Sequence, residues 1–144
     1  MDVPSVTIGN SLYLVAQVEG GLLALGDIHA AMGLGEVFGT AIEIGSQVTI
    51  TIDVIKKQPL FINPLIETQS HFEIVDSSTD IINSIKTLTK LAIKLIMELN
   101  NVSFEDAYAC VGSACDMKIA QVVNPNYTTV VSIPKAILHT QRLY

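Results

Sequence analysis

The sequence is short of charge and lacks the segments that bind nucleic acid or cross membranes. Only 15% of its 144 residues are charged, against about 25% in an average domain. The net charge of −6 comes without a cluster of lysines or arginines, which argues against a phosphate backbone or an anionic membrane surface as partner. No stretch reaches the ~18 uninterrupted apolar residues of a spanning helix, and Met1 to Pro4 carries no basic leader. We therefore expect no nucleic-acid partner, no membrane and a cytoplasmic location.

Cysteine is also scarce, and this limits redox and zinc-knuckle chemistry. The two cysteines, Cys110 and Cys115, have a spacing that matches neither a CxxC redox pair nor a usual zinc knuckle. We expect both to be buried as small hydrophobic side chains. Hydrophobic residues make up 49% of the chain, and large exposed apolar patches usually mark interaction sites. The composition therefore predicts an oligomer or a subunit.

The first half of the chain has the patterns of β structure. Glu19-Gly20-Gly21 separates two apolar runs and predicts the turn of a hairpin. Apolar and polar side chains alternate in residues 48–54, which predicts a strand with one buried face. Asn63-Pro64 introduces another extended segment, because proline disfavours helix in the residue before it, and the β section should close near Val75. The extended segments are predicted at residues 12–18, 22–25, 48–54 and 65–68.

The apolar period becomes helical after Ser78. Either Ser78 or Thr79 is placed to cap the first turn, and a helix of about five turns should follow. Ser103 opens a second helix with a start similar to a capping box, and this helix should end near Asp116. One apolar stripe of the first helix is formed by Ile81, Ile85, Leu88, Ala92, Leu95 and Leu99.

The end of the chain predicts a β-hairpin and completes the fold class. Strand-like runs at 118–123 and 129–133 flank a turn-forming sequence at 124–127. Strands are followed by helices and then by strands, without βαβ alternation, so the α+β class is expected. We predict one domain, residues 1–144, with a β-rich, sandwich-like body, two helices and a C-terminal β-hairpin.

The segment from Gly26 to Glu43 gathers glycines and ionisable residues. Asp27 and His29 are two apart, so their side chains share a face if the segment is extended. Together with Glu36 they supply two carboxylates and an imidazole, which can hold a divalent metal or run acid/base chemistry. The alternative is structural, because a carboxylate and a histidine on a loop more often stabilise a turn or cap backbone amides.

Other candidate residues are weaker. Glu67 lies in the extended segment after Pro64, where apolar residues give way to polar ones, and can reach a site from there. Ser113 lies between small residues, but it lacks the strand and sharp turn of a nucleophile elbow. A helical serine that satisfies its own backbone is the better interpretation of Ser113.

A resemblance to a known family rests on residues 22–36, Leu-Leu-Ala-Leu-Gly-Asp-Ile-His-Ala-Ala-Met-Gly-Leu-Gly-Glu. This segment resembles the signature of acetamidase/formamidase enzymes. Members of that family hydrolyse short aliphatic amides and build a β-rich body with appended helices. The resemblance implies that this chain corresponds to the carboxy-terminal half of such an enzyme. The likeness continues through residues 39–43, 103–108, 116–125 and 133–135.

The resemblance also has two departures at the site. Met1-Asp2 matches the last two residues of a His-Gly-Gly-Asn-Met-Asp type motif, whose histidine has no equivalent here. Leu34 stands where relatives commonly carry an aspartate. Asp2 is therefore a candidate member of a site with Asp27 and His29.

The function implied by the resemblance is hydrolysis of small linear amides, such as formamide and acetamide, to acid and ammonia. In this hypothesis Asp2, Asp27 and His29 hold a zinc or calcium ion. The catalytic residues are Asp27, His29 and Glu36, with Glu36 as the proton shuttle.

The remaining predictions concern the oxyanion and the partner. Backbone amides of Gly33 and Gly35 are expected to stabilise the oxyanion. Glu43 is a candidate to hydrogen-bond the metal ligands from outside the metal's own ligand set, and the alternative is that this strand residue faces solvent or an interface. The alternative hypothesis is a non-catalytic structural subunit. Such a subunit would assemble with a separately encoded amino-terminal half or with copies of itself.

Overall fold

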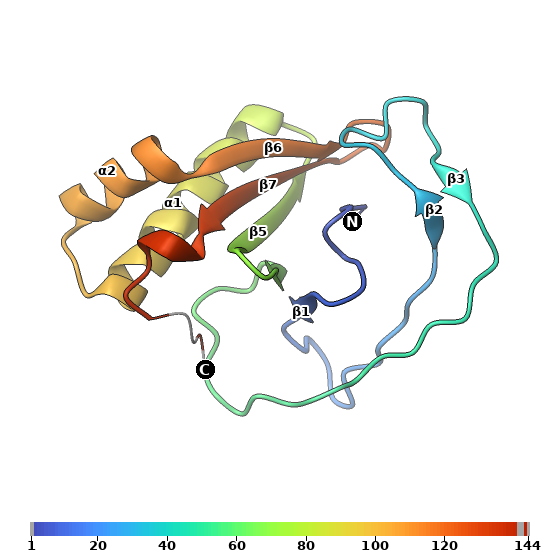
Figure 1. Cartoon of the computed structure of the whole chain (residues 1–144), viewed down its shortest axis with the longest axis horizontal. Helices are drawn as coiled ribbons and strands as arrows, with labels where there is room; N and C mark the ends of the chain where they lie inside the picture. Colours follow the sequence, from blue (N-terminus) through green and yellow to red (C-terminus); the bar gives the residue numbers. More distant parts are fainter. Residues whose placement is uncertain (1, 141–142, 144) are drawn as a thin grey trace.

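The computed structural model describes residues 2–140 and residue 143, and it has α+β architecture (Figure 1). An antiparallel five-stranded sheet has the order β1-β4-β5-β7-β6. A separate two-stranded ribbon pairs β2 with β3. The strands are β1 (Ser11–Tyr13), β2 (His29–Ala31), β3 (Ile42–Glu43), β4 (Leu65–Glu67), β5 (His71–Ser78), β6 (Asp116–Gln121) and β7 (Tyr127–Pro134). The helical elements are α1 (Ile81–Asn100), α2 (Phe104–Ala114) and the short 3₁₀ helix η1 (Lys135–Ile137).

The two helices begin at side-chain caps. Ser103 caps α2 as predicted, because its hydroxyl accepts the backbone N–H of Asp106. The predicted cap of α1 at Ser78 or Thr79 is wrong. Asp80 takes that place, and its carboxylate accepts the N–H groups of two residues in the first turn. Among the described residues, no helix has the length and apolar character needed to span a membrane.

The helices cover one face of the sheet and form the main core. Alternate residues of β5 and β7 point to that face, among them Phe72 and Ile133, because successive strand residues face opposite sides. The stripe of α1 packs onto them through fully buried side chains such as Leu88 and Leu95. The predicted α+β class, β-rich body, two helices and C-terminal hairpin are confirmed. β5 runs on to Ser78, past the predicted end near Val75.

The opposite face of the sheet carries a smaller apolar cluster and a buried ion pair. The cluster consists of Val3, Ile66, Val75, Ala120 and Val130. Beside it, Lys118 Nζ lies 2.7 Å from Glu73 Oε1, and Ser132 Oγ donates to the same oxygen at 3.1 Å. Burial raises the pKa of Glu73, but the hydrogen bond and charge of Lys118, together with hydrogen bonds from Ser5 and Ser132, outweigh this effect, so the pKa lies below its usual value of 4.5. This ion pair links the edge strand β6 to β5 across β7, which lies between them.

Residues 14–58, which we call the outer segment, run away from the sheet and return to it (Figure 1). The predicted strand at 48–54 is not formed, and neither is the one at 22–25. Of the predicted strand at 12–18, only residues up to Tyr13 pair. The predicted turn is present, with the Gly21 N–H donating to the Val18 carbonyl at 3.1 Å.

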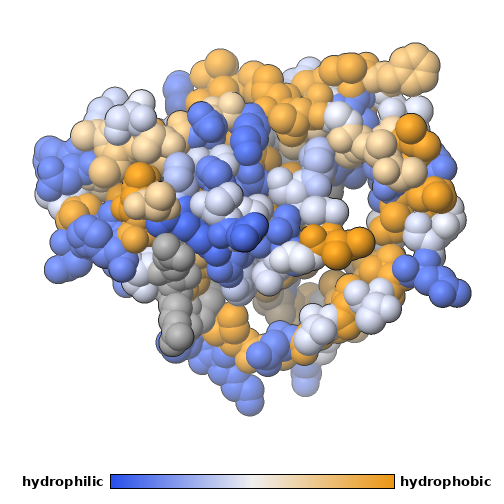
Figure 2. Space-filling model, viewed as in Figure 1, coloured by the Kyte–Doolittle hydropathy of each residue, from blue (hydrophilic) through white to orange (hydrophobic). Residues whose placement is uncertain are grey.

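The predicted burial of one face of 48–54 is also wrong for this chain by itself. Val48 and Ile50 are each 47% exposed, and Val54 is 72% exposed. An extended segment needs a neighbouring strand for its backbone hydrogen bonds and a second layer for its apolar face. Residues 48–54 have neither here. Much of the surface of the outer segment is apolar (Figure 2).

Both cysteines are free thiols that lie half-buried beside the main core. Burial, with smaller effects from Cys110 and Asp116, raises the pKa of the Cys115 thiol to about 11. The thiol form therefore dominates at neutral pH, and Cys115 packs as an apolar group, in keeping with the prediction.

The ion pair of β6 predicts a stability change. Lys118→Met leaves the Glu73 carboxylate, whose side chain is 4% exposed, without its cation. We expect a loss of about 3 kcal/mol in the free energy of unfolding at pH 7, at the low end for broken buried pairs because Lys118 is partly exposed. Urea unfolding measures this loss. Lys86→Met, on the exposed side of α1, is the control and should change stability by less than ~0.5 kcal/mol.

The same variant has a predicted pH dependence. The pKa of Glu73 is lowered in the folded state, so its stabilising effect is complete above the unfolded value of 4.5 and is lost as the pH falls through the folded value. The deficit of the Lys118→Met protein should therefore shrink below pH 4.5. A variant as stable as the wild type at pH 7 would contradict this role of the pair.

Candidate metal centre

The ribbon of β2 and β3 brings together two side chains that are far apart in sequence. His29 and Glu43 are direct partners in the antiparallel register, and a bulge follows before Ala31 pairs with Ile42. Directly opposed residues place their Cβ atoms about 4.5–5.5 Å apart on the same face. Strand pairing therefore carries Glu43 to His29 across the glycine-rich loop between them.

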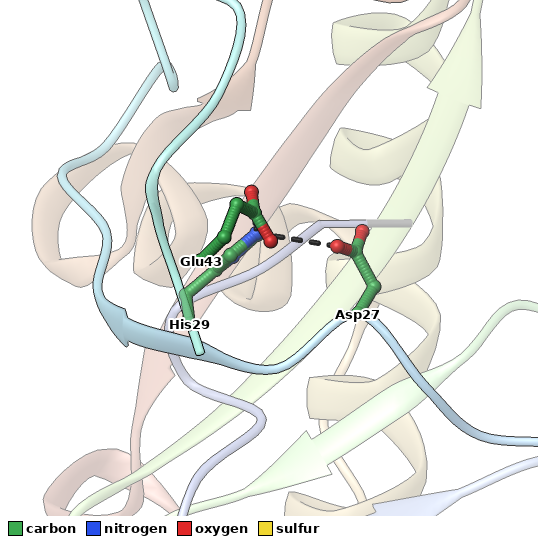
Figure 3. A group of neighbouring side chains, drawn as sticks. All are labelled: Asp27, His29 and Glu43. Carbon is green, nitrogen blue, oxygen red and sulfur yellow. Dashed lines mark ion pairs between the residues drawn. The ribbon is translucent and has the colours of Figure 1, made fainter. Parts of the chain in front are cut away.

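Asp27, His29 and Glu43 form a compact group of ionisable side chains (Figure 3). His29 Nε2 lies 2.8 Å from Glu43 Oε1 and 3.2 Å from Asp27 Oδ1. One potential ligand atom from each residue lies within 4.8 Å of the others. Within the described part of the chain, this is the one group of at least three His, Cys, Asp or Glu residues with such spacing.

The group is open to solvent on its acidic side. The His29 side chain is 10% exposed, whereas those of Asp27 and Glu43 are 63% and 58% exposed. A hydrogen bond from the Thr40 hydroxyl, 2.8 Å from Glu43 Oε1, is the main cause that lowers the pKa of Glu43. Desolvation opposes it, and the charge and hydrogen bond of His29 add to the lowering. Glu43 is thus held in its charged form, ready to bind a cation or a proton donor.

Two of the predicted site residues adopt backbone conformations that are uncommon for residues with side chains. Asp27 has φ of 59° and Glu36 has φ of 44°, both in the left-handed region. Aspartate tolerates this region better than most residues, but glutamate does not. Strained backbone of this kind concentrates at functional sites, where the surrounding structure holds it in place.

The structure brings only part of the predicted set together. Asp27 and His29 share a face, as their spacing predicts. Glu36 is half-buried and lies outside the group of three. Asp2 also lies outside this group, where its Oδ2 accepts a hydrogen bond from Asn124 at 3.2 Å. Glu43, which the sequence analysis expected outside the set of ligands, is a member of the group of three.

The predicted oxyanion donors differ from each other in the structure. The Gly35 N–H donates to the Ala120 carbonyl at 2.9 Å, so this amide is occupied within the protein. The Gly33 carbonyl accepts the N–H of Glu36 at 3.2 Å, which forms a tight turn. Only the Gly33 amide therefore keeps the predicted role as a candidate.

The donor set fits zinc better than calcium. Imidazole nitrogen and carboxylate oxygen are both zinc ligands, whereas calcium takes oxygen ligands. Tetrahedral zinc with bonds of about 2.0–2.1 Å spaces its ligand atoms roughly 3.3 Å apart, which is close to the distances of His29 from its two partners. The same arrangement also describes a protonated His29 that bridges two carboxylates, and metal titration separates these two states.

The weaker candidates have structural partners. The Ser113 hydroxyl donates to the Ala109 carbonyl one helical turn earlier, at 2.8 Å, which confirms the prediction of a self-satisfied helical serine. Glu67 accepts hydrogen bonds from Lys135 Nζ and the Tyr13 hydroxyl, each at 2.6 Å. Glu67 therefore ties the edge of the sheet to the segment after β7.

The chain is similar to known proteins over nearly its whole length. The model of the Acetamidase/Formamidase family matches residues 1–140. An acetamidase from Bacillus halodurans is 32% identical with a TM-score of 0.88, and the match covers 94% of this chain and 45% of that protein. No curated protein matches the chain.

Two further solved structures are similar. A predicted acetamidase/formamidase from Thermoanaerobacter tengcongensis is 31% identical with a TM-score of 0.90, and the match covers 95% of this chain and 45% of that one. An acetamidase from Yersinia enterocolitica is 28% identical with a TM-score of 0.91, and the match covers 97% and 42%. The chain thus spans less than half the length of these relatives.

The hydroxyl of Thr40 generates a prediction for the charge of the site. Thr40→Val removes the donor that stabilises the Glu43 carboxylate, so the pKa of Glu43 should rise toward its usual value of 4.5. A carbon-detected NMR titration of the glutamate carboxyl groups measures this change. Thr49→Val, in another exposed part of the outer segment, is the matched control and should leave Glu43 unchanged. The proposed electrostatics fail if Glu43 titrates identically in both variants.

Proposed function

Since this chain belongs to the acetamidase/formamidase family, we propose that it hydrolyses small linear aliphatic amides, such as formamide and acetamide, to a carboxylic acid and ammonia. The observation that carries the proposal is the solvent-open group of Asp27, His29 and Glu43, a histidine with two carboxylates, of which Asp27 has left-handed backbone. Support for the substrate class comes from the solved relatives named acetamidase.

In this proposal Asp27, His29 and Glu43 hold a zinc ion, and Asp2 is kept as a further proposed ligand from the family motif. Bound zinc would supply a positive charge that polarises the amide carbonyl and makes water more acidic. His29 is the most buried of the three, so it anchors the group to the ribbon. Asp27 and Glu43 bring negative charge to the cation from the solvent side.

Glu36 is the proposed proton shuttle. Its carboxylate takes one proton from a water molecule as the water oxygen bonds to the amide carbon, and the carbonyl electron pair moves onto the carbonyl oxygen. The Gly33 N–H is the proposed hydrogen-bond donor to that oxygen. The electron pair then returns, the carbon–nitrogen bond breaks, and Glu36 gives its proton to the departing nitrogen. One water and one amide thus yield one acid and one ammonia.

Ammonia release from formamide and acetamide tests this proposal. We expect the zinc-loaded protein to turn over and chelation to stop it. Glu36→Gln should lower kcat at least ~100-fold by removing the proton shuttle, while zinc affinity stays unchanged. Asp27→Asn should abolish turnover by weakening zinc binding, with little change in the thermal midpoint because Asp27 is exposed.

Glu105→Gln, a change of the same kind in the exposed first turn of α2, is the control and should keep full activity. Full activity of both Asp27→Asn and Glu36→Gln would rule out the proposed site. Silence of the wild-type chain in every condition would rule out catalysis by this chain alone and favour the second candidate function.

That second candidate is a structural subunit that assembles with an amino-terminal half or with copies of itself. It is favoured by the apolar side chains of the outer segment, which nothing in the described chain covers, and by the relatives' additional length. Exposed patches of this kind mark protein–protein contacts. The most exposed members include Val37, Phe38, Ile52 and Val54.

The alternating segment at 48–54 provides matched variants for this candidate. The double variant Ile50→Lys, Ile52→Lys charges its apolar face, while Thr49→Lys, Thr51→Lys charges the other face of the same segment. We expect the wild-type chain to sediment above its monomer mass of 15.5 kDa, and only the isoleucine variant to dissociate. Self-assembly is contradicted by a wild-type monomer, or by equal effects of both variants.

A further inference from the structure

The outer segment is attached to the sheet at Gly35. The Gly35 N–H donates to the Ala120 carbonyl at 2.9 Å, and the Val122 N–H donates to the Gly35 carbonyl at 3.0 Å. These bonds form a parallel bridge between Gly35 and Gln121, at the end of β6. Gly35 is the one buried residue of the outer segment, all of which is described. In Figure 1 the loop between β2 and β3 lies beside the β6–β7 turn.

Glycine is required at this contact. Gly35 has φ of 91°, which residues with side chains rarely adopt. A Cβ atom added there would stand 3.0 Å from Val37 Cγ1. The backbone conformation therefore favours glycine at this contact, and an added side chain would also crowd Val37 of the same loop.

The turn that receives Gly35 is built by a buried amide side chain. Gln121 is 1% exposed. Its Oε1 accepts the N–H of Val123 at 2.6 Å and that of Asn124 at 2.8 Å, and its Nε2 donates to the Asn126 carbonyl at 3.4 Å. Gln121 thus holds both sides of the turn between β6 and β7.

The same turn also holds the start of the chain. Asn124 Nδ2 donates to Asp2 Oδ2 at 3.2 Å. One turn therefore contacts Asp2, a predicted ligand, and the glycine loop that lies between His29 and Glu43 in the sequence. Segments from three parts of the chain meet on a turn whose conformation Gln121 sets.

We propose that the β6–β7 turn is the platform that positions the metal-binding ribbon, and that Gln121 is its positioning residue. The metal part of this inference rests on the proposed function. Since every other residue of the outer segment is exposed or only partly buried, its place relative to the sheet depends on the Gly35 contact. Without the Gln121 acceptor the turn is no longer held in one conformation, and the outer segment is less ordered. Metal binding must then order this long segment, which costs more conformational entropy than in the wild type.

The test uses Gln121→Met, which keeps the length and flexibility of the side chain but removes its acceptor and donor. Gln121→Glu keeps the acceptor for the Val123 and Asn124 amides and serves as the rescue variant. Ser77→Ala removes the hydroxyl contact of Ser77 with Thr128 at 3.0 Å, at the other end of the same turn, and serves as the control.

Amide hydrogen exchange of the metal-free protein is the first readout. We expect exchange at Gly35 and Val122 to accelerate at least tenfold in Gln121→Met, to return toward wild type in Gln121→Glu and to stay unchanged in Ser77→Ala. Protection of α1 should remain in all variants. Unchanged protection at Gly35 in Gln121→Met, or an equal loss in Ser77→Ala, overturns the platform.

Zinc affinity is the second readout. We expect the Kd for Zn²⁺ to rise at least tenfold in Gln121→Met and to recover in Gln121→Glu, a rescue that a general loss of stability would not produce. An unchanged Kd in Gln121→Met overturns the positioning role. A wild-type protein that binds no Zn²⁺ overturns the proposed metal centre instead, and the exchange data still decide whether the turn is the platform.

Discussion

Two backbone hydrogen bonds at Gly35 join the part of this protein that has a core to the part that carries its ionisable cluster. On one side lie the sheet and its helices, with α1 packed on β5 and β7. On the other side lies the outer segment, whose residues are largely exposed. Because Gly35 is its one buried residue, the geometry of the cluster relative to the core depends on this short contact. The rest of the site, including the pairing of His29 with Glu43, is local to the ribbon.

The fold between residues 65 and 134 could be predicted from the sequence, because each of its elements finds its partner within the chain. The stripe of α1 meets the apolar face of β5 and β7, and the hairpin of β6 and β7 closes over a short turn. The capping error at Ser78 is small, since Asp80 offers a better acceptor two residues on. The segment at 48–54 fails for a different reason. Its alternation says which face a strand would bury, but not which strand would pair with it.

For the site, too, contacts within one segment could be predicted from the sequence, whereas contacts that depend on strand pairing could not. Spacing within one extended segment predicts that Asp27 and His29 share a face. The two side chains do meet, although Asp27 itself has left-handed backbone. The position of Glu43 depends on cross-strand register, and here a bulge and a long glycine-rich loop set that register. A signal for it existed, since Glu43 lies in a short strand-like run after the glycines and can pair back onto His29. Ligation by Asp2 and proton transfer by Glu36 stay predictions.

Because the outer segment is exposed, substitutions in it have different consequences from substitutions in the core. Substitutions in the helix-covered core change the free energy of folding, and most of them are removed for that reason. Substitutions in the outer segment alter side chains that contribute almost nothing to the folding of this chain. Evolution can therefore retune the chemistry and the contact surface of the outer segment while the body that supports it stays intact, with Gly35 as the one position where both demands meet.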